Sequence, residues 1–165
     1  MPISAKYLIR IMLVAAVAAA VCAALILASS GAAAGGKAQT LHFFDKTVSL
    51  TVTRADGTVI KRPPYPEAQA GDVLDVVSLA YTGNHAKHAK KASASTHLRC
   101  TFGAAGPPPD CMSHVAIGSS MLVFEGDPGT IVLGTGRYLG ATGRVLSNKD
   151  VGGDASDIVV RVILK

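Results

Sequence analysis

The sequence has 165 residues, of which 49% are hydrophobic, and a formal net charge of +5. This charge is too small to indicate nucleic-acid binding, and no basic helix or interleaving of aromatic and basic residues supports such a partner. The chain has no Trp and only four Tyr and four Phe, which argues against an aromatic platform for stacking sugars.

The N-terminal residues predict an export signal. Lys6 and Arg10 are followed by residues 11–28, which contain no charged residue, and then by small residues. A basic, an apolar and a small-residue region are the three parts of a secretory signal, and the alanines ending at Ala34 fit its cleavage pattern. We therefore predict a signal peptide over residues 1–34 and a secreted protein, extracellular or in the cell envelope.

Cleavage after Ala34 leaves 131 residues, which is a normal size for one hydrophobic core. We predict a flexible lead-in over 35–40 and a single domain over 41–165. The alternative is a retained anchor, because an apolar run of 18 residues just spans a bilayer at about 1.5 Å per residue. We expect contact with a membrane only if this segment remains uncleaved.

The mature chain begins with a predicted strand over 41–53, where apolar and polar residues alternate with the period of a half-buried strand. Asp56 and Gly57 then give a hairpin-type turn signal, and the prolines of 61–70 indicate a loop or a sheet edge. The residues of this first strand that we predict to face the core are Phe44, Val48, Leu50 and Val52.

Six further segments are rich in β-branched or apolar residues, and no segment shows a helical period over three turns. Short strands separated by turns indicate a sandwich or a barrel. We predict an all-β fold preceded by the signal helix. Closure into a barrel would remove exposed sheet edges, but the strand pattern alone does not decide between a sandwich and a barrel. Gly118 is interpreted as a bulge within the longest strand. The segments are 73–81, 96–102, 112–124, 130–133, 144–149 and 157–164.

A glycine-rich segment follows the strand at 130–133, with spacings that allow a tight corner between strands. Together with Tyr138 and the upstream Gly71-Asp72, it resembles the corresponding part of the allene oxide cyclase and dirigent superfamily, including its secreted bacterial members. A phosphate-cradling loop is disfavoured, because no helix follows to present its N-terminus. The glycines of this structural turn are Gly134, Gly136, Gly140 and Gly143.

The resemblance implies a closed antiparallel barrel of about eight strands with an apolar interior. It also implies a homo-oligomer, because many members of the superfamily are trimers. Plant cyclases of this superfamily steer the cyclisation of a fatty-acid epoxide, and dirigent proteins control the coupling of phenoxy radicals. Their catalytic residues have no clear counterpart here, since the first strand offers only Asp45 where the cyclase has a glutamate.

We therefore expect a secreted barrel that binds or guides a small hydrophobic ligand without a cofactor. The alternatives are an isomerase or cyclase that acts on a reactive lipid-like substrate, and a non-catalytic protein of the cell-envelope surface. The catalytic candidates are Asp45, Asp75, Glu125 and Tyr81, which we expect at strand ends or on the outer face. A carboxylate buried in the barrel would instead have a raised pKa and could protonate a substrate.

Cys100 and Cys111 remain after signal removal, and an even pair in an exported chain predicts a disulfide. The alternative is a zinc site, because His97 and His114 lie three residues outside the cysteines in a mirrored ligand set. The disulfide is favoured, since residues three apart on a strand face opposite sides, and we expect no metal.

His85 and His88 belong to a polar segment, 84–95, that we interpret as a solvated loop. Neighbouring ammonium groups disfavour a cation site there. The same segment would suit contact with an acidic cell-surface polymer. Its lysines are Lys87, Lys90 and Lys91.

Overall fold

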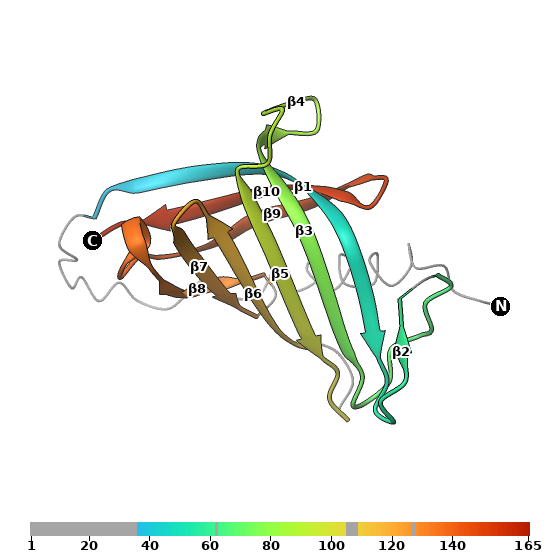
Figure 1. Cartoon of the computed structure of the whole chain (residues 1–165). Helices are drawn as coiled ribbons and strands as arrows, with labels where there is room; N and C mark the ends of the chain where they lie inside the picture. Colours follow the sequence, from blue (N-terminus) through green and yellow to red (C-terminus); the bar gives the residue numbers. More distant parts are fainter. Residues whose placement is uncertain (1–35, 62, 105–108, 127) are drawn as a thin grey trace, which may run out of the picture.

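The computed structural model describes residues 36–61, 63–104, 109–126 and 128–165, which form a closed antiparallel β-barrel (Figure 1). Eight strands follow one another in the order β1, β10, β9, β8, β7, β6, β5 and β3, and β3 pairs with β1 to close the ring. The predicted all-β barrel is thereby confirmed, while the predicted signal helix lies outside the described residues. The strands are β1 (Ala38–Thr53), β3 (Val73–Asn84), β5 (Ala94–Thr101), β6 (Asp110–Ile117), β7 (Ser120–Glu125), β8 (Thr130–Gly134), β9 (Thr142–Gly152) and β10 (Ala155–Ile163).

Three short elements complete the described part of the chain. β2 (Val59–Ile60) pairs with the end of β1, and β4 (Lys87–His88) pairs with the end of β3. A 3-10 turn, η1 (Gly136–Tyr138), links β8 to β9. Over the described ranges, the chain forms no helix with the length and apolar character needed to cross a membrane.

A β-bulge at Val48 divides β1 into two parts. Before it Thr47 pairs with Ser78 of β3, and after it Ser49 pairs with Val77, so Val48 has no partner in the register. An unpaired residue of this kind moves the following side chains to the opposite face of the strand.

The bulge corrects the predicted core face of β1. Phe43 is buried before the bulge and Val52 is buried after it, so the buried parity changes from odd to even. The prediction is wrong for Phe44, which lies on the outer face, and for Val48, which is 62% exposed. It holds for Val52, and Leu50 is half-buried.

Two predicted boundaries also change. The segment 112–124 is not one strand with a bulge but the hairpin β6–β7, in which Ile117 pairs with Ser120 across a turn. Gly118 has φ +61 in this turn, a conformation that glycine adopts without steric cost. β1 begins at Ala38, so part of the predicted lead-in, 35–40, belongs to the barrel.

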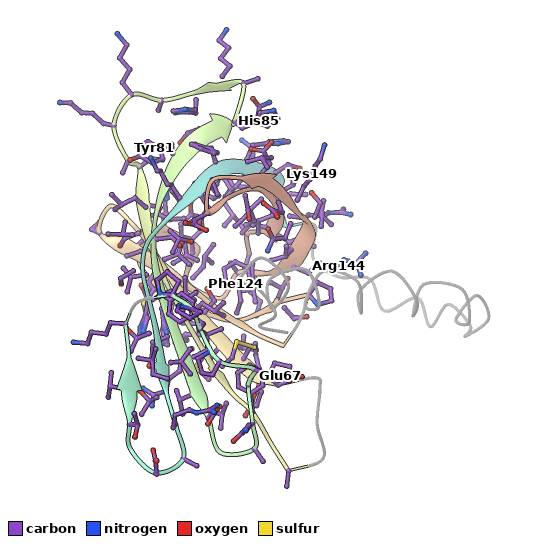
Figure 2. The ribbon with its side chains drawn as sticks, turned by 90° about the vertical axis from the view of Figure 1, so that its right-hand side faces the viewer. Glu67, Tyr81, His85, Phe124, Arg144 and Lys149 are labelled. Atoms are coloured by element: carbon purple, nitrogen blue, oxygen red, sulfur yellow. A yellow bond between two sulfur atoms is a disulfide. The ribbon has the colours of Figure 1, made fainter. Side chains whose placement is uncertain are left out.

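The barrel interior is a packed apolar core, and Figure 2 shows Phe124 toward its middle. Tyr138, Leu122 and Val162 are each no more than 1% exposed. Removal of this apolar surface from water is the main favourable term in folding. The buried cluster comprises Phe43, Ala80, Ala94, Ile117, Leu122, Phe124, Ile131, Tyr138, Ala141, Val160 and Val162.

An ion pair fixes the segment between β2 and β3. Arg54 Nη1 donates to Asp72 Oδ2 at 2.6 Å and to the Glu67 carbonyl at 3.1 Å. Asp72 also accepts from the backbone N–H of Gln69 at 2.8 Å. The described residues of 61–70 contain no strand, as predicted, and Glu67 lies at the opposite end of the molecule from Tyr81 (Figure 2).

Candidate functional site

The glycine-rich segment after β8 forms a corner at one end of the barrel. Gly134 lies so close to the Tyr138 carbonyl oxygen that a Cβ atom at this position would overlap it. Gly136 has φ +57 and packs in the same way against the Ser120 side chain. Both positions therefore require glycine, and the corner places the Tyr138 side chain in the core.

A hollow of about 600 Å³ opens at this end, which we call the mouth. The mouth is formed by the start of β1, the end of β3, the β6–β7 turn and η1. Its lining includes the buried side chains of Phe43, Ile117 and Tyr138, together with the exposed residues Ser119 and Arg137. Buried apolar groups combined with a few polar groups are typical of sites for small molecules.

Arg137 is the charged residue of the hollow. Its guanidinium lies over the Tyr138 ring, with 4.7 Å between Cζ and the ring centroid. Its backbone N–H donates to Ser120 Oγ at 3.1 Å. Among the residues that the structure describes, no acidic side chain forms an ion pair with Arg137. The cation–π contact therefore holds a positive charge beside the hollow.

Asp45 lies inside the barrel, in contrast to the expected position at a strand end or on the outer face. Its side chain is buried, and Thr96 Oγ1 donates to Asp45 Oδ1 at 3.3 Å. Burial raises the pKa of the Asp45 carboxyl above its ordinary value, and hydrogen bonds from Ser78 and Thr96 offset part of the rise. Asp45 does not line the hollow.

The other three catalytic candidates lie outside the core, as expected. Asp75 is on the outer face of β3, where Oδ1 lies 3.1 Å from His97 Nε2. Tyr81 is on the same face, with its ring centroid 6.1 Å from that of Phe44. Glu125 is exposed at the end of β7. The structure therefore does not bring the candidates together into one catalytic site.

Cys100 and Cys111 form the predicted disulfide between β5 and β6. The two residues are opposite each other in the register, with Cα atoms 4.1 Å apart, and both are buried. His97 and His114 also pair across these strands, but on the outer face. The alternative zinc set is therefore not formed, because the cysteines are bonded to each other and the histidines lie on the other side of the sheet.

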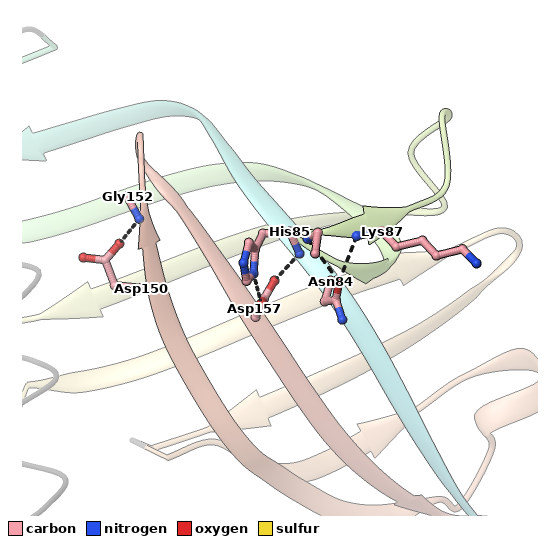
Figure 3. A network of polar contacts seen from close by, with 7 residues as sticks. Asn84, His85, Lys87, Asp150, Gly152 and Asp157 are labelled. Atoms are coloured by element: carbon pink, nitrogen blue, oxygen red, sulfur yellow. Dashed lines mark hydrogen bonds and ion pairs between the residues drawn. The ribbon is translucent and has the colours of Figure 1, made fainter.

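The polar segment 84–93 folds into an arm that is anchored to the barrel, rather than an open loop. His85 donates its backbone N–H to Asp157 Oδ1 at 2.7 Å, and its Nδ1 lies 2.5 Å from Oδ2 (Figure 3). Partial desolvation acts to raise the pKa of Asp157, but the hydrogen bonds and charge of His85 lower it overall. The His88 ring stacks on Phe44, with 4.7 Å between centroids. The exposed lysines of the arm are Lys87, Lys90 and Lys91.

Comparison of the chain with protein-family models, curated proteins and solved structures gave no match. Within the described ranges, no group of three or more His, Cys, Asp or Glu side chains is arranged to hold a metal ion. The mouth and the outer face of the barrel are therefore the features from which a function can be inferred.

The hollow combines residues that the sequence pattern did not bring together. The sequence predicts Ile117 and Ser119 within one strand. It does not indicate that these two residues line the same hollow as Phe43 and Tyr138. The missed signal is the run from Gly118 to Ser120, because a glycine followed by small polar residues is typical of a turn.

Proposed function

We propose that this protein is a secreted β-barrel of the allene oxide cyclase and dirigent type that binds or guides a small, largely apolar molecule at its mouth. The observation that carries the proposal is the hollow of about 600 Å³, lined in part by the buried Phe43, Ile117 and Tyr138. Cavities for small molecules have volumes of about 300–1,000 Å³ and are lined mainly by apolar side chains with a few polar groups. The hollow agrees with this volume range, and its buried apolar side chains lie beside several polar ones.

Two observations support export. A disulfide such as Cys100–Cys111 persists in oxidising compartments and is rare in the cytosol. The N-terminal pattern of residues 1–34 is that of a secretory signal. Both agree with a protein that meets its ligand outside the cytoplasm.

A binding role is favoured over an isomerase or cyclase, because the candidate acid groups do not line the hollow. A general acid must lie within hydrogen-bond reach of its substrate. Asp45 is buried but does not line the hollow, while Asp75 and Glu125 lie outside the core. The isomerase alternative requires a ligand that reaches Asp45.

The third possibility, a non-catalytic protein of the envelope surface, does not need the hollow. It would act through the exposed lysines of the arm 84–93. The two binding modes are distinguishable, because an apolar probe reports on the hollow and not on the arm.

The test is a titration of the secreted protein with the uncharged fluorescent probe N-phenyl-1-naphthylamine. Ser119→Trp places an indole in the hollow and should weaken probe binding by about tenfold or more, or 1.4 kcal/mol. Thr130→Trp is the matched control, because Thr130 is exposed and pairs with Glu125 at the far end of the β7–β8 hairpin. Equal binding by the two variants, or no binding by the wild type, would overturn the proposal.

A further inference from the structure

The outer face of the barrel carries two histidines that the hollow does not use. His97 on β5 and His114 on β6 are directly opposite in the register, so both side chains leave the same face of the sheet. Their ring centroids are 6.5 Å apart, and their planes are inclined at 27°. Opposite residues of an antiparallel pair have Cβ atoms about 4.5–5.5 Å apart, which lets two imidazoles converge on one ion.

Asp75, on the neighbouring strand β3, orients one of these rings. Asp75 Oδ1 lies 3.1 Å from His97 Nε2. A carboxylate accepts a hydrogen bond from a protonated ring nitrogen, so neutral His97 carries its proton on Nε2 and keeps the electron pair of Nδ1 for another partner. Histidines that bind metals commonly donate their other ring N–H to a carboxylate in this way.

Arg99 supports the role of Asp75 as an acceptor. Arg99 Nη1 lies 3.8 Å from the same Asp75 oxygen, with the Arg99 side chain 60% exposed. The guanidinium and the His97 ring therefore lie on the same Asp75 oxygen. The three side chains thus form a short polar chain on the outer face of β3 and β5.

The histidines of the arm differ from His97 and His114 in their placement. His85 Nδ1 lies 2.5 Å from Asp157 Oδ2, a carboxylate contact like that of His97, but His85 has no histidine opposite it in a strand pair. His88 stacks on Phe44, and its Nδ1 lies 2.9 Å from the Ala89 carbonyl oxygen. His85 and His88 are not opposite each other in a strand pair, whereas His97 and His114 are.

We infer that His97 and His114 bind a divalent transition-metal ion, with Asp75 fixing the His97 ring and water completing the coordination. Imidazole nitrogen suits Cu²⁺, Ni²⁺ and Zn²⁺, and a given site of this kind binds Cu²⁺ most tightly in the divalent series. Within the described ranges no group of three or more His, Cys, Asp or Glu side chains is arranged to hold a metal ion, so the inferred site has two protein ligands only. The inference is independent of ligand binding at the mouth.

The probe for this site is Cu²⁺ alone, added to the oxidised secreted protein and followed by electron paramagnetic resonance. We expect one equivalent of Cu²⁺ with hyperfine coupling to two imidazole nitrogens. His97→Gln and His114→Gln should each remove this two-imidazole signal. Asp75→Ala should weaken binding by about 10–100-fold, the usual effect of losing a residue that orients a ligand.

The paired variant His85→Gln/His88→Gln is the matched control and should keep the two-imidazole signal. The four substituted histidines lie outside the core, so we expect every variant to fold, and urea unfolding checks this. Equal Cu²⁺ binding by the wild type and by His97→Gln/His114→Gln would overturn the inference. Loss of the signal only in the arm variant would overturn it as well.

Discussion

Arg54 and Asp72 form a largely buried ion pair, in which Arg54 Nη1 lies 2.6 Å from Asp72 Oδ2 and the side chains are 22% and 2% exposed. Removing the arginine leaves the Asp72 carboxylate buried without its counter-charge. Breaking a buried pair in this way costs about 3–5 kcal/mol. We expect Arg54→Met to lower the free energy of unfolding by about 3 kcal/mol, measured by urea denaturation.

Arg99 provides the matched control for this prediction. It lies 3.8 Å from Asp75 and its side chain is 60% exposed. Exposed pairs contribute about 0–1 kcal/mol, so Arg99→Met should have a much smaller effect than Arg54→Met. Similar losses in the two variants would show that burial does not determine the strength of the Arg54–Asp72 pair.

The contribution of Asp45 to the free energy of unfolding decreases as the pH rises, whereas that of a carboxylate in an ion pair increases. Burial raises its pKa in the folded state, so the unfolded chain loses this proton first as the pH rises. Its contribution to stability is complete below the ordinary pKa of aspartate, about 3.9, and is lost as the pH rises through the higher folded-state pKa. Asp45→Asn should therefore gain stability relative to the wild type as the pH rises from about 3 to about 7.

Urea denaturation of both proteins at a series of pH values measures this gain. Glu125→Gln, an exposed position at the end of β7, is the control for the loss of one negative charge. A difference between Asp45→Asn and the wild type that stayed constant over this pH range would contradict the prediction.

Two turns of this barrel could be predicted because their signals are local, in contrast to the missed β6–β7 turn. In the β1–β2 turn, Thr58 donates its backbone N–H to Asp56 Oδ1 at 2.8 Å, and Gly57 has φ +88. In the β9–β10 turn, Gly152 donates its N–H to Asp150 Oδ1 at 2.8 Å (Figure 3). Each interaction joins residues that are two apart, so a short stretch of sequence is enough to indicate it.

The inward face of β1 could not be predicted from local pattern. Valine is usual in strands, so Val48 gives no sign of the bulge, and the adjacent Phe43 and Phe44 are compatible with either parity. Pairing with Ser78 and Val77 on β3 determines which residue is left unpaired. The same limit applies to the hollow, whose lining comes from segments far apart in the chain.

The disulfide should stabilise the barrel by restricting the unfolded chain. Cys100 and Cys111 are 11 residues apart, for which the chain-entropy estimate gives about 3 kcal/mol. A reductant should therefore lower the urea midpoint of the wild type toward that of Cys100→Ala/Cys111→Ala and leave the midpoint of this variant unchanged. A wild-type midpoint that did not move after both thiols had formed would contradict the prediction.

Gly134 connects the glycine corner to the hollow, because a Cβ atom at this position would overlap the carbonyl oxygen of Tyr138. Gly134→Ala must displace the backbone at Tyr138, and overpacking of this kind costs about 1–3 kcal/mol. Since the buried Tyr138 side chain also lines the hollow, the variant should lose binding of N-phenyl-1-naphthylamine together with stability. Gly103→Ala is the matched control, because a Cβ atom there meets nothing within 4 Å.

The two measurements on Gly134→Ala separate the role of the corner in folding from its role at the mouth. A loss of stability with unchanged probe binding would mean that Tyr138 supports the core without shaping the hollow. Unchanged stability would mean that the backbone between Gly134 and Tyr138 yields to a methyl group at little cost. The prediction holds only if Gly134→Ala loses both stability and probe binding while Gly103→Ala stays within about 0.5 kcal/mol of the wild type. That result would show that ligand binding depends on glycine at position 134.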